Sequence, residues 1–194
     1  MAERLLVING HPDPRPERLC AALAGAYCNG AATAGRIVRR IDVGDLDFPL
    51  IRTAEDFENG PIPPAIKKAQ EAVRQADHVT MVYPLWLGEQ PALLKGFLEQ
   101  VFRYGFALEK PGAQSWTGLL KGKSARVIVT MGMPGPVYRL MFGAHGVRSM
   151  ERSVLWMSGF KPVRHTFFGG AGSATERRRG AWLDHVRTLG AHGQ

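Results

Sequence analysis

Apolar residues along this chain occur in two patterns that alternate from one end to the other. Short, almost continuous apolar runs are typical of strands that are buried on both faces of a parallel sheet. Such runs predict strands over residues 4–9, 36–42, 78–83, 125–131 and 163–168. We therefore expect a central sheet of five strands.

Between these runs, apolar residues recur every three or four positions, which predicts helices. The clearest case is the set Leu93, Leu94, Phe97, Leu98 and Val101, which falls on one helical face. The same spacing predicts helices around residues 19–27, 66–76, 149–158 and 182–189. In the first of them, the prolines at positions 14 and 16 are expected in the first turn, where backbone N–H groups have no partner anyway.

Strands that alternate with helices predict one α/β domain over residues 1–194, with a parallel sheet covered by helices on both faces. A length of 194 residues suits a single domain. Segments 44–64 and 104–122 are rich in glycine and proline and are predicted as loops. A loop as long as 104–122 is often functional.

Charge and composition remove several classes of function. The net charge is +8, but the basic residues are scattered and not interleaved with stacking aromatics, so a basic surface is favoured over nucleic-acid binding. The longest apolar runs are about four to six residues, too short to span a bilayer or to form a signal peptide, so we expect a cytoplasmic protein. Cys20 and Cys28 would lie about 12 Å apart on one helix, too far for a disulfide. The spacing of cysteines and histidines predicts no metal site.

Three loops follow predicted strands with residues that turn sharply or allow close approach of a ligand: 9–14, 83–88 and 130–135. In an open α/β sheet, ligands bind outside the carboxyl ends of the strands, where the strand order reverses. A helix N-terminus after the first loop would suit a flavin phosphate, and apolar side chains in the other two would suit the flavin ring. Taken singly, Pro84 could instead be a strand terminator and Trp86 a core aromatic.

Residues 83–97 read Tyr-Pro-Leu-Trp-Leu-Gly-Glu-Gln-Pro-Ala-Leu-Leu-Lys-Gly-Phe. This stretch resembles the Pro-Leu-Trp-Trp-Gly-Gly-x-Pro-Ala-x-Leu-Lys-Gly signature of the flavodoxin-like NAD(P)H:quinone oxidoreductases, the DT-diaphorase and modulator-of-drug-activity group. Loop 10–14 and the segment 130–146 are also similar to that family, and the resemblance runs from about residue 4 to residue 170. It implies a flavodoxin-like sheet of order 2-1-3-4-5. It also implies a bound FMN or FAD, NAD(P)H as co-substrate, and ping-pong hydride transfer to a quinone.

The resemblance assigns roles to individual residues. The cofactor-binding set is expected to comprise His11 and Arg18 at the phosphate, Pro84, Leu85, Trp86 and Leu87 along the ring, and Thr130, Met131, Gly132 and Met133 at its polar edge. Tyr138 and His145 match the catalytic pair that borders the nicotinamide and quinone slot; the alternatives are a packing aromatic for Tyr138 and a surface loop residue for His145. Arg18 stands near the place of a serine that many members use for the phosphate, and Glu89 replaces a common glycine.

The resemblance also bears on partners. Family members build their site across two subunits, and a homodimer is expected here from the aromatic residues Tyr104, Phe106, Trp116, Tyr138 and Phe142. Some relatives are ancillary subunits of potassium-efflux antiporters, which is the alternative function. A third interpretation is an electron carrier like flavodoxin itself, but the long loop and the 138–145 segment favour a substrate slot.

Overall fold

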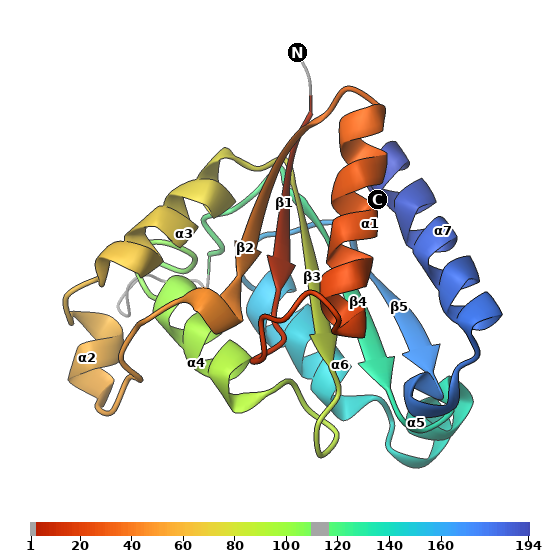
Figure 1. Ribbon diagram of the computed structural model, residues 1–194. Coiled ribbons are helices and arrows are strands. Elements are labelled where there is room, and N and C mark those ends of the chain that lie inside the picture. The colour runs from red at the N-terminus through yellow and green to blue at the C-terminus, as the bar shows by residue number, and fades with distance from the viewer. Residues whose placement is uncertain (1–2, 110–116) are drawn as a thin grey trace.

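The computed structural model describes residues 3–109 and 117–194. Five parallel strands form one sheet in the order β2-β1-β3-β4-β5 (Figure 1). The strands are β1 (Arg4–Asn9), β2 (Ile37–Asp42), β3 (His78–Pro84), β4 (Ser124–Met131) and β5 (Val163–Gly169). The five predicted strands and their order are confirmed, with ends that differ by at most one residue.

Helices cover both faces of the sheet. On one face, α1 (Leu19–Thr33) and α7 (Glu176–His192) lie side by side (Figure 1). On the other face lie α3 (Pro64–Gln75), α4 (Ala92–Val101) and the helical segment that follows β4. Alternate residues of β1 serve the two cores: Leu5 and Val7 belong to the α1–α7 core, and Leu6 and Ile8 to the other. Each of these side chains contributes roughly 1.5–3 kcal/mol by burial, which is why the strands read as unbroken apolar runs.

Two predictions about the first half of the chain are wrong in detail. Helix α1 begins only at Leu19, so Pro14 and Pro16 lie in the preceding turn and not in the first helical turn. Segment 44–64, predicted as a loop, contains the short helix α2 (Ala54–Glu58). That helix begins because the Thr53 hydroxyl accepts a hydrogen bond from the backbone N–H of Asp56 at 3.0 Å.

The segment after β4 is more helical than its sequence predicts. It forms α5 (Gly135–Met141), α6 (His145–Ser149) and a π-helix, η2 (Met150–Trp156), which continues α6. The predicted helix over 149–158 therefore exists but begins four residues earlier, and α5 was not predicted. The prolines at the start of α5 are typical of a turn, but proline is also well suited to the first positions of a helix.

Two of the five aromatic residues from which a dimer was expected lie in the core of the chain. Phe106 and Tyr138 are buried there, and the ring of Tyr104 packs edge-on against Phe57 with centroids 5.5 Å apart. Phe106 and Tyr138 are therefore not available to a dimer surface, whereas Phe142 is exposed. Trp116, with residues 110–116 of the predicted functional loop, lies outside the described residues. Within the described ranges, no helix has the length and hydropathy needed to cross a membrane.

Candidate functional site

The strand order reverses between β1 and β3, and the loops after these two strands meet there. The chain passes from β1 to β2 on one side and then returns to place β3 on the other side of β1. The His11 ring, after β1, lies edge-on to the Trp86 ring, after β3, with centroids 5.8 Å apart and planes at 81°. Two of the three predicted loops are thus in contact at the position where sheets of this kind bind ligands.

Hydrogen bonds fix the loop after β1. The backbone N–H of His11 donates to Asn9 Oδ1 at 3.3 Å, and that of Asp13 donates to His11 Nδ1 at 2.9 Å. Because Nδ1 accepts, the imidazole proton of neutral His11 resides on Nε2. Burial lowers the pKa of His11 and so favours this neutral form.

The same loop contains a compact charge cluster. Arg15 Nε lies 2.9 Å from Asp13 Oδ1, and Arg18 Nε lies 2.6 Å from Asp13 Oδ2. Hydrogen bonds from Arg15 hold the pKa of the Asp13 carboxyl well below its usual range, with Arg18 adding to the effect. Arg18 is the N-cap residue of α1, where it makes no side-chain cap hydrogen bond, and the first turn of the helix has no acidic residue. Guanidinium groups beside an uncapped helix N-terminus can donate hydrogen bonds to an anion. In this structure the anion is the carboxylate of Asp13.

The loop after β3 makes a tight turn at residues 86–89. The backbone N–H groups of Trp86 and Glu89 each donate to the other residue's carbonyl, at 2.9 and 3.0 Å. Leu87 and Gly88 both have positive φ, +51° and +86°, as in a type I′ turn. Leu87 is also fully exposed, and Trp86 is 48 % exposed. A leucine held in the left-handed region with no apolar cover is a strained feature of the kind that clusters at binding sites.

Helices α5 and α6 close onto this turn. Tyr138 Oη donates to the carbonyl of Gly88 at 3.0 Å, and the Tyr138 ring lies edge-on to Phe167 at 5.9 Å. Burial raises the pKa of Tyr138, although backbone N–H groups of Val147 and Gly146 oppose this. Gly146 has no room for a side chain, because a Cβ there would overlap the Gly88 carbonyl. We call the contact of residues 86–89 with residues 138–147 the junction.

The predicted catalytic pair is divided between two environments at the junction. Tyr138 is 1 % exposed, so it does pack as an aromatic, but its hydroxyl is bound to the turn. His145 is exposed, and its imidazole lies against Gly143, where a Cβ would meet Nε2 at 2.8 Å. The structure therefore brings both residues to one segment, with the histidine toward solvent.

The predicted polar-edge residues lie at the end of β4. The Thr130 carbonyl accepts the N–H of Leu85 at 2.8 Å, which ties the loop after β3 to the strand. The side chains of Thr130 and Met131 are buried, as is Pro84, whereas Gly132 is exposed and open space surrounds its Cβ position. Close approach of a ligand to backbone is therefore possible at Gly132 and not at the two residues before it.

Several residues of this region were not found by sequence reasoning. Asp13 and Arg15 carry a readable signal, since a carboxylate is followed by arginines at the second and fifth positions in the first loop. Gly146 carries no such signal in the sequence. It must be a glycine because the turn at residues 86–89, far away in the chain, leaves no room for a side chain there. Gln90, in the loop after β3, has a buried Oε1 atom without a hydrogen-bond partner in the described structure. A buried acceptor of this kind needs a donor from water or a ligand.

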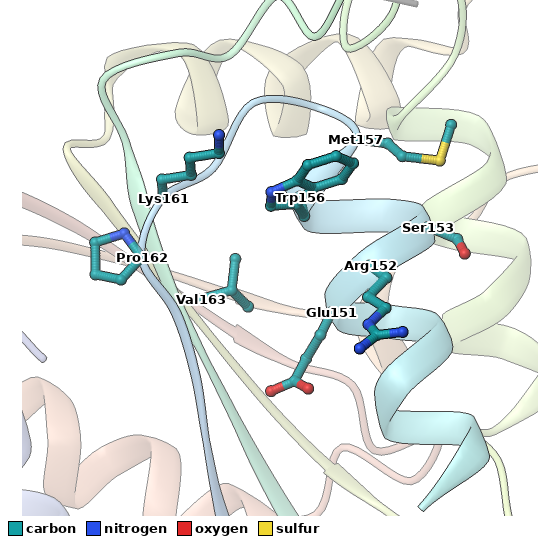
Figure 2. Close-up of a pocket in the computed structure, with 8 residues that line it drawn as sticks. All are labelled: Glu151, Arg152, Ser153, Trp156, Met157, Lys161, Pro162 and Val163. Atoms are coloured by element: carbon teal, nitrogen blue, oxygen red, sulfur yellow. The ribbon is translucent and has the colours of Figure 1, made fainter.

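Two cavities flank the edge strand β5. One, of about 510 Å³, is lined by the junction residues Leu140 and Ala144 and by Phe167 of β5. Figure 2 shows the other, of about 520 Å³, between η2 and the start of β5, where Lys161 Nζ lies 5.4 Å from the centroid of the Trp156 ring. The cavity in Figure 2 contains no predicted site residue and lies at the opposite end of β5 from the junction.

A family model described as the flavodoxin-like fold matches residues 3–189. The chain belongs to the flavodoxin-like family. It is 38 % identical over 94 residues to an uncharacterized NAD(P)H oxidoreductase of Haemophilus influenzae, covering 47 % of this chain and 46 % of that protein. It is 31 % identical over 151 residues to the human ribosyldihydronicotinamide dehydrogenase [quinone], covering 72 % of this chain and 63 % of that protein. The resemblance to quinone oxidoreductases noted in the sequence is thus confirmed at the level of family.

Among solved structures, the NAD(P)H:quinone oxidoreductase from Methanothermobacter marburgensis is similar over the whole of both chains, with a TM-score of 0.86 and 23 % identity, which supports the fold. A shorter match, 38 % identical over 74 residues, is to the glutathione-regulated potassium-efflux system ancillary protein KefG of Enterobacter sp. (strain 638), covering 38 % of each chain. The chain spans about half to two-thirds of the length of the curated relatives it matches first.

Proposed function

We propose that this chain is a flavin-dependent NAD(P)H:quinone oxidoreductase that works in the cytoplasm by a ping-pong mechanism. One observation carries the proposal: the loops after β1 and β3 meet at the switch point through the His11–Trp86 contact, and helix α5 joins them through the Tyr138–Gly88 hydrogen bond. Apolar surface of Trp86 and Leu87 thus lies beside a loop that carries two arginines, which suits a flavin ring and its phosphate. The names of the similar proteins supply the reaction class.

The residues present fit a flavin. Arg18 and the uncapped start of α1 would bind the flavin phosphate where the loop now binds the Asp13 carboxylate. Trp86 and Leu87 offer apolar surface, and Gly132 offers accessible backbone. When bound, FMN or FAD would accept hydride from NAD(P)H and then deliver it to a quinone that takes the same slot.

The proposed catalytic residues have distinct tasks. Tyr138 keeps its proton because burial raises its pKa, so its hydroxyl holds the turn at residue 88 in place at neutral pH. This fixes the wall of the slot beside Trp86. His145 is exposed at the same junction, where its imidazole would act as the general acid that supplies a proton to the reduced quinone.

Purification and steady-state kinetics test the proposal. The protein is expected to be yellow, or to become yellow when loaded with FMN or FAD, and to oxidise NADPH or NADH once menadione is added. Because a relative is named for ribosyldihydronicotinamide, that donor belongs in the same assay. Parallel lines in double-reciprocal plots would support the ping-pong order, and a protein that binds neither flavin would contradict the proposal.

We also propose a homodimer. The support is a set of exposed apolar residues at the junction, namely Leu87, Leu140, Met141 and Phe142. Exposed apolar side chains gathered near one end of a domain are typical of a protein interface. Light scattering at micromolar concentration is expected to give twice the chain mass, and a monomer would contradict this.

A second candidate function is that of an ancillary regulatory flavoprotein of a potassium-efflux antiporter. The observation in its favour is the 74-residue match to such a protein. It predicts that the purified chain changes potassium efflux from vesicles that contain the antiporter. Rapid quinone turnover with no effect on efflux would favour the enzyme alone.

A further inference from the structure

The loop between β1 and α1 already holds one anionic group, the carboxylate of Asp13. Arg15 binds it through Nε at 2.9 Å to Oδ1 and through Nη2 at 2.7 Å to Oδ2. Arg18 binds the same Oδ2 through Nε at 2.6 Å and through Nη2. Both arginines therefore have a hydrogen-bond acceptor within the loop, without any ligand.

The geometry matters because of which guanidinium atoms are used. The Nε–Nη2 edge is one that can bind a carboxylate or phosphate with two parallel hydrogen bonds. Both arginines direct this edge at Asp13. While the carboxylate is in place, neither arginine can offer that edge to a second anion.

Charge acts in the same direction. Two guanidinium groups and one carboxylate leave a single net positive charge in the cluster, and a phosphate bound there would lie beside a carboxylate of like sign. The Asp13 carboxyl is ionised at neutral pH, as carboxyl groups ordinarily are, and hydrogen bonds from Arg15 and Arg18 lower its pKa further. Protonation therefore does not relieve the repulsion.

We propose that Asp13 is an internal competitor for the phosphate of the cofactor. Its carboxylate occupies the arginine edges that the phosphate would use, keeps the loop ordered when no cofactor is bound, and lowers the affinity for flavin phosphates. Flavin is then held loosely and exchanges with solution. This inference rests on the proposed flavin function and concerns only the phosphate end of the site.

Substitution of Asp13 by the similarly sized but neutral asparagine tests the role. Fluorescence titrations of the full chain, freed of bound flavin, measure dissociation constants for FMN and for riboflavin, which lacks the phosphate. Asp13→Asn is expected to tighten FMN binding by about tenfold, because a like charge near the phosphate is removed, and to leave riboflavin unchanged. Glu17→Gln is the matched control, since Glu17 is exposed and has the same charge in the same loop; it should change either constant far less.

The outcomes separate this inference from the proposed function. If the Asp13→Asn protein binds FMN equally well or more weakly than the wild type, while riboflavin binding persists, the competitor role is wrong and Asp13 positions the arginines instead. If neither protein binds either flavin, the flavin function itself is wrong. Circular dichroism checks that the variant is folded, and Asp13→Ser provides the same comparison should the asparagine variant fail to fold.

Discussion

The loops after β1 and β3 end strands at the same edge of the sheet, but the first is closed by charge pairs and the second leaves apolar side chains open. In the first, Asp13 joins two arginines, and the side-chain hydrogen bonds of Asp13 and His11 lie within the loop. In the second, Leu87 is fully exposed and strained, and the turn is held from outside by Tyr138. Ligand binding at the first loop is therefore expected to depend on charge and on salt concentration. Binding at the second loop is expected to depend on the shape of the turn.

The largest effect on stability and activity is expected at the junction, where Tyr138 and Gly146 contact the second loop. Gly146→Ala places a methyl group where it would overlap the Gly88 carbonyl oxygen and crowd Glu89 Cα, two backbone atoms. Overpacking of this kind costs about 1–3 kcal/mol, and movement of the turn should remove most of the quinone reductase activity. Chemical denaturation and steady-state assays measure the two losses.

Gly180→Ala is the matched control for that variant, because no atom lies near its Cβ position in α7. It should leave activity unchanged and raise the free energy of unfolding by up to about 1 kcal/mol through helix propensity. Equal behaviour of the two variants would mean that the junction is not a rigid contact.

The next effect concerns the charged loop. Arg18→Gln removes a charged donor at the start of α1 and is expected to weaken FMN binding by about tenfold or more, since a hydrogen bond to a charged group contributes about 1.5–3 kcal/mol. Riboflavin should bind as before. Fluorescence titration checks this, with Arg152→Gln, an exposed arginine of η2, as control. Equal weakening of both flavins would place Arg18 at the ring and not at the phosphate.

A smaller effect is expected at the apolar loop. Trp86→Ala removes the aromatic surface beside His11 and should weaken FMN and riboflavin alike, by about threefold to tenfold, as expected for loss of one aromatic contact. Trp156→Ala, an exposed tryptophan in the cavity of Figure 2, is the control and should change neither constant. If Trp86→Ala weakened FMN binding but not riboflavin binding, the assignment of the ring to the second loop and the phosphate to the first would be wrong.

The smallest effect is expected from alkaline pH. The pKa of Tyr138 is raised above its ordinary value of about 10. Its contribution to stability is therefore complete below pH 10 and is lost only as the pH rises through the higher value of the folded state. Turnover between pH 7 and pH 9 should show no loss from this group, and Tyr138→Phe should be lower at each pH by a constant factor. A fall in the wild type that is absent from Tyr138→Phe would show that the phenol ionises in this range.

Much of the fold could be predicted, for a local reason. Strand β1 is buried on both faces, so Leu5 to Ile8 must all be apolar, and the run is visible without any knowledge of the partners. The apolar residues on one face of α4 are likewise visible in the sequence alone. Helix α5 was missed because its prolines are equally compatible with a turn, and only packing of Tyr138 on Phe167 decides between them.

The sequence by itself determined the alternation of strands and helices, the sheet and the three loops at its carboxyl edge, because apolar periodicity and turn residues act over a few neighbouring positions. It also carried the family resemblance in residues 83–97. Only the tertiary structure decided that Gly88 meets Tyr138 and Gly146, that Phe106 lies in the core, and that Asp13 pairs with both arginines. Such contacts depend on distances between segments remote in the chain or on side-chain directions within a loop, and neither is encoded in a local pattern.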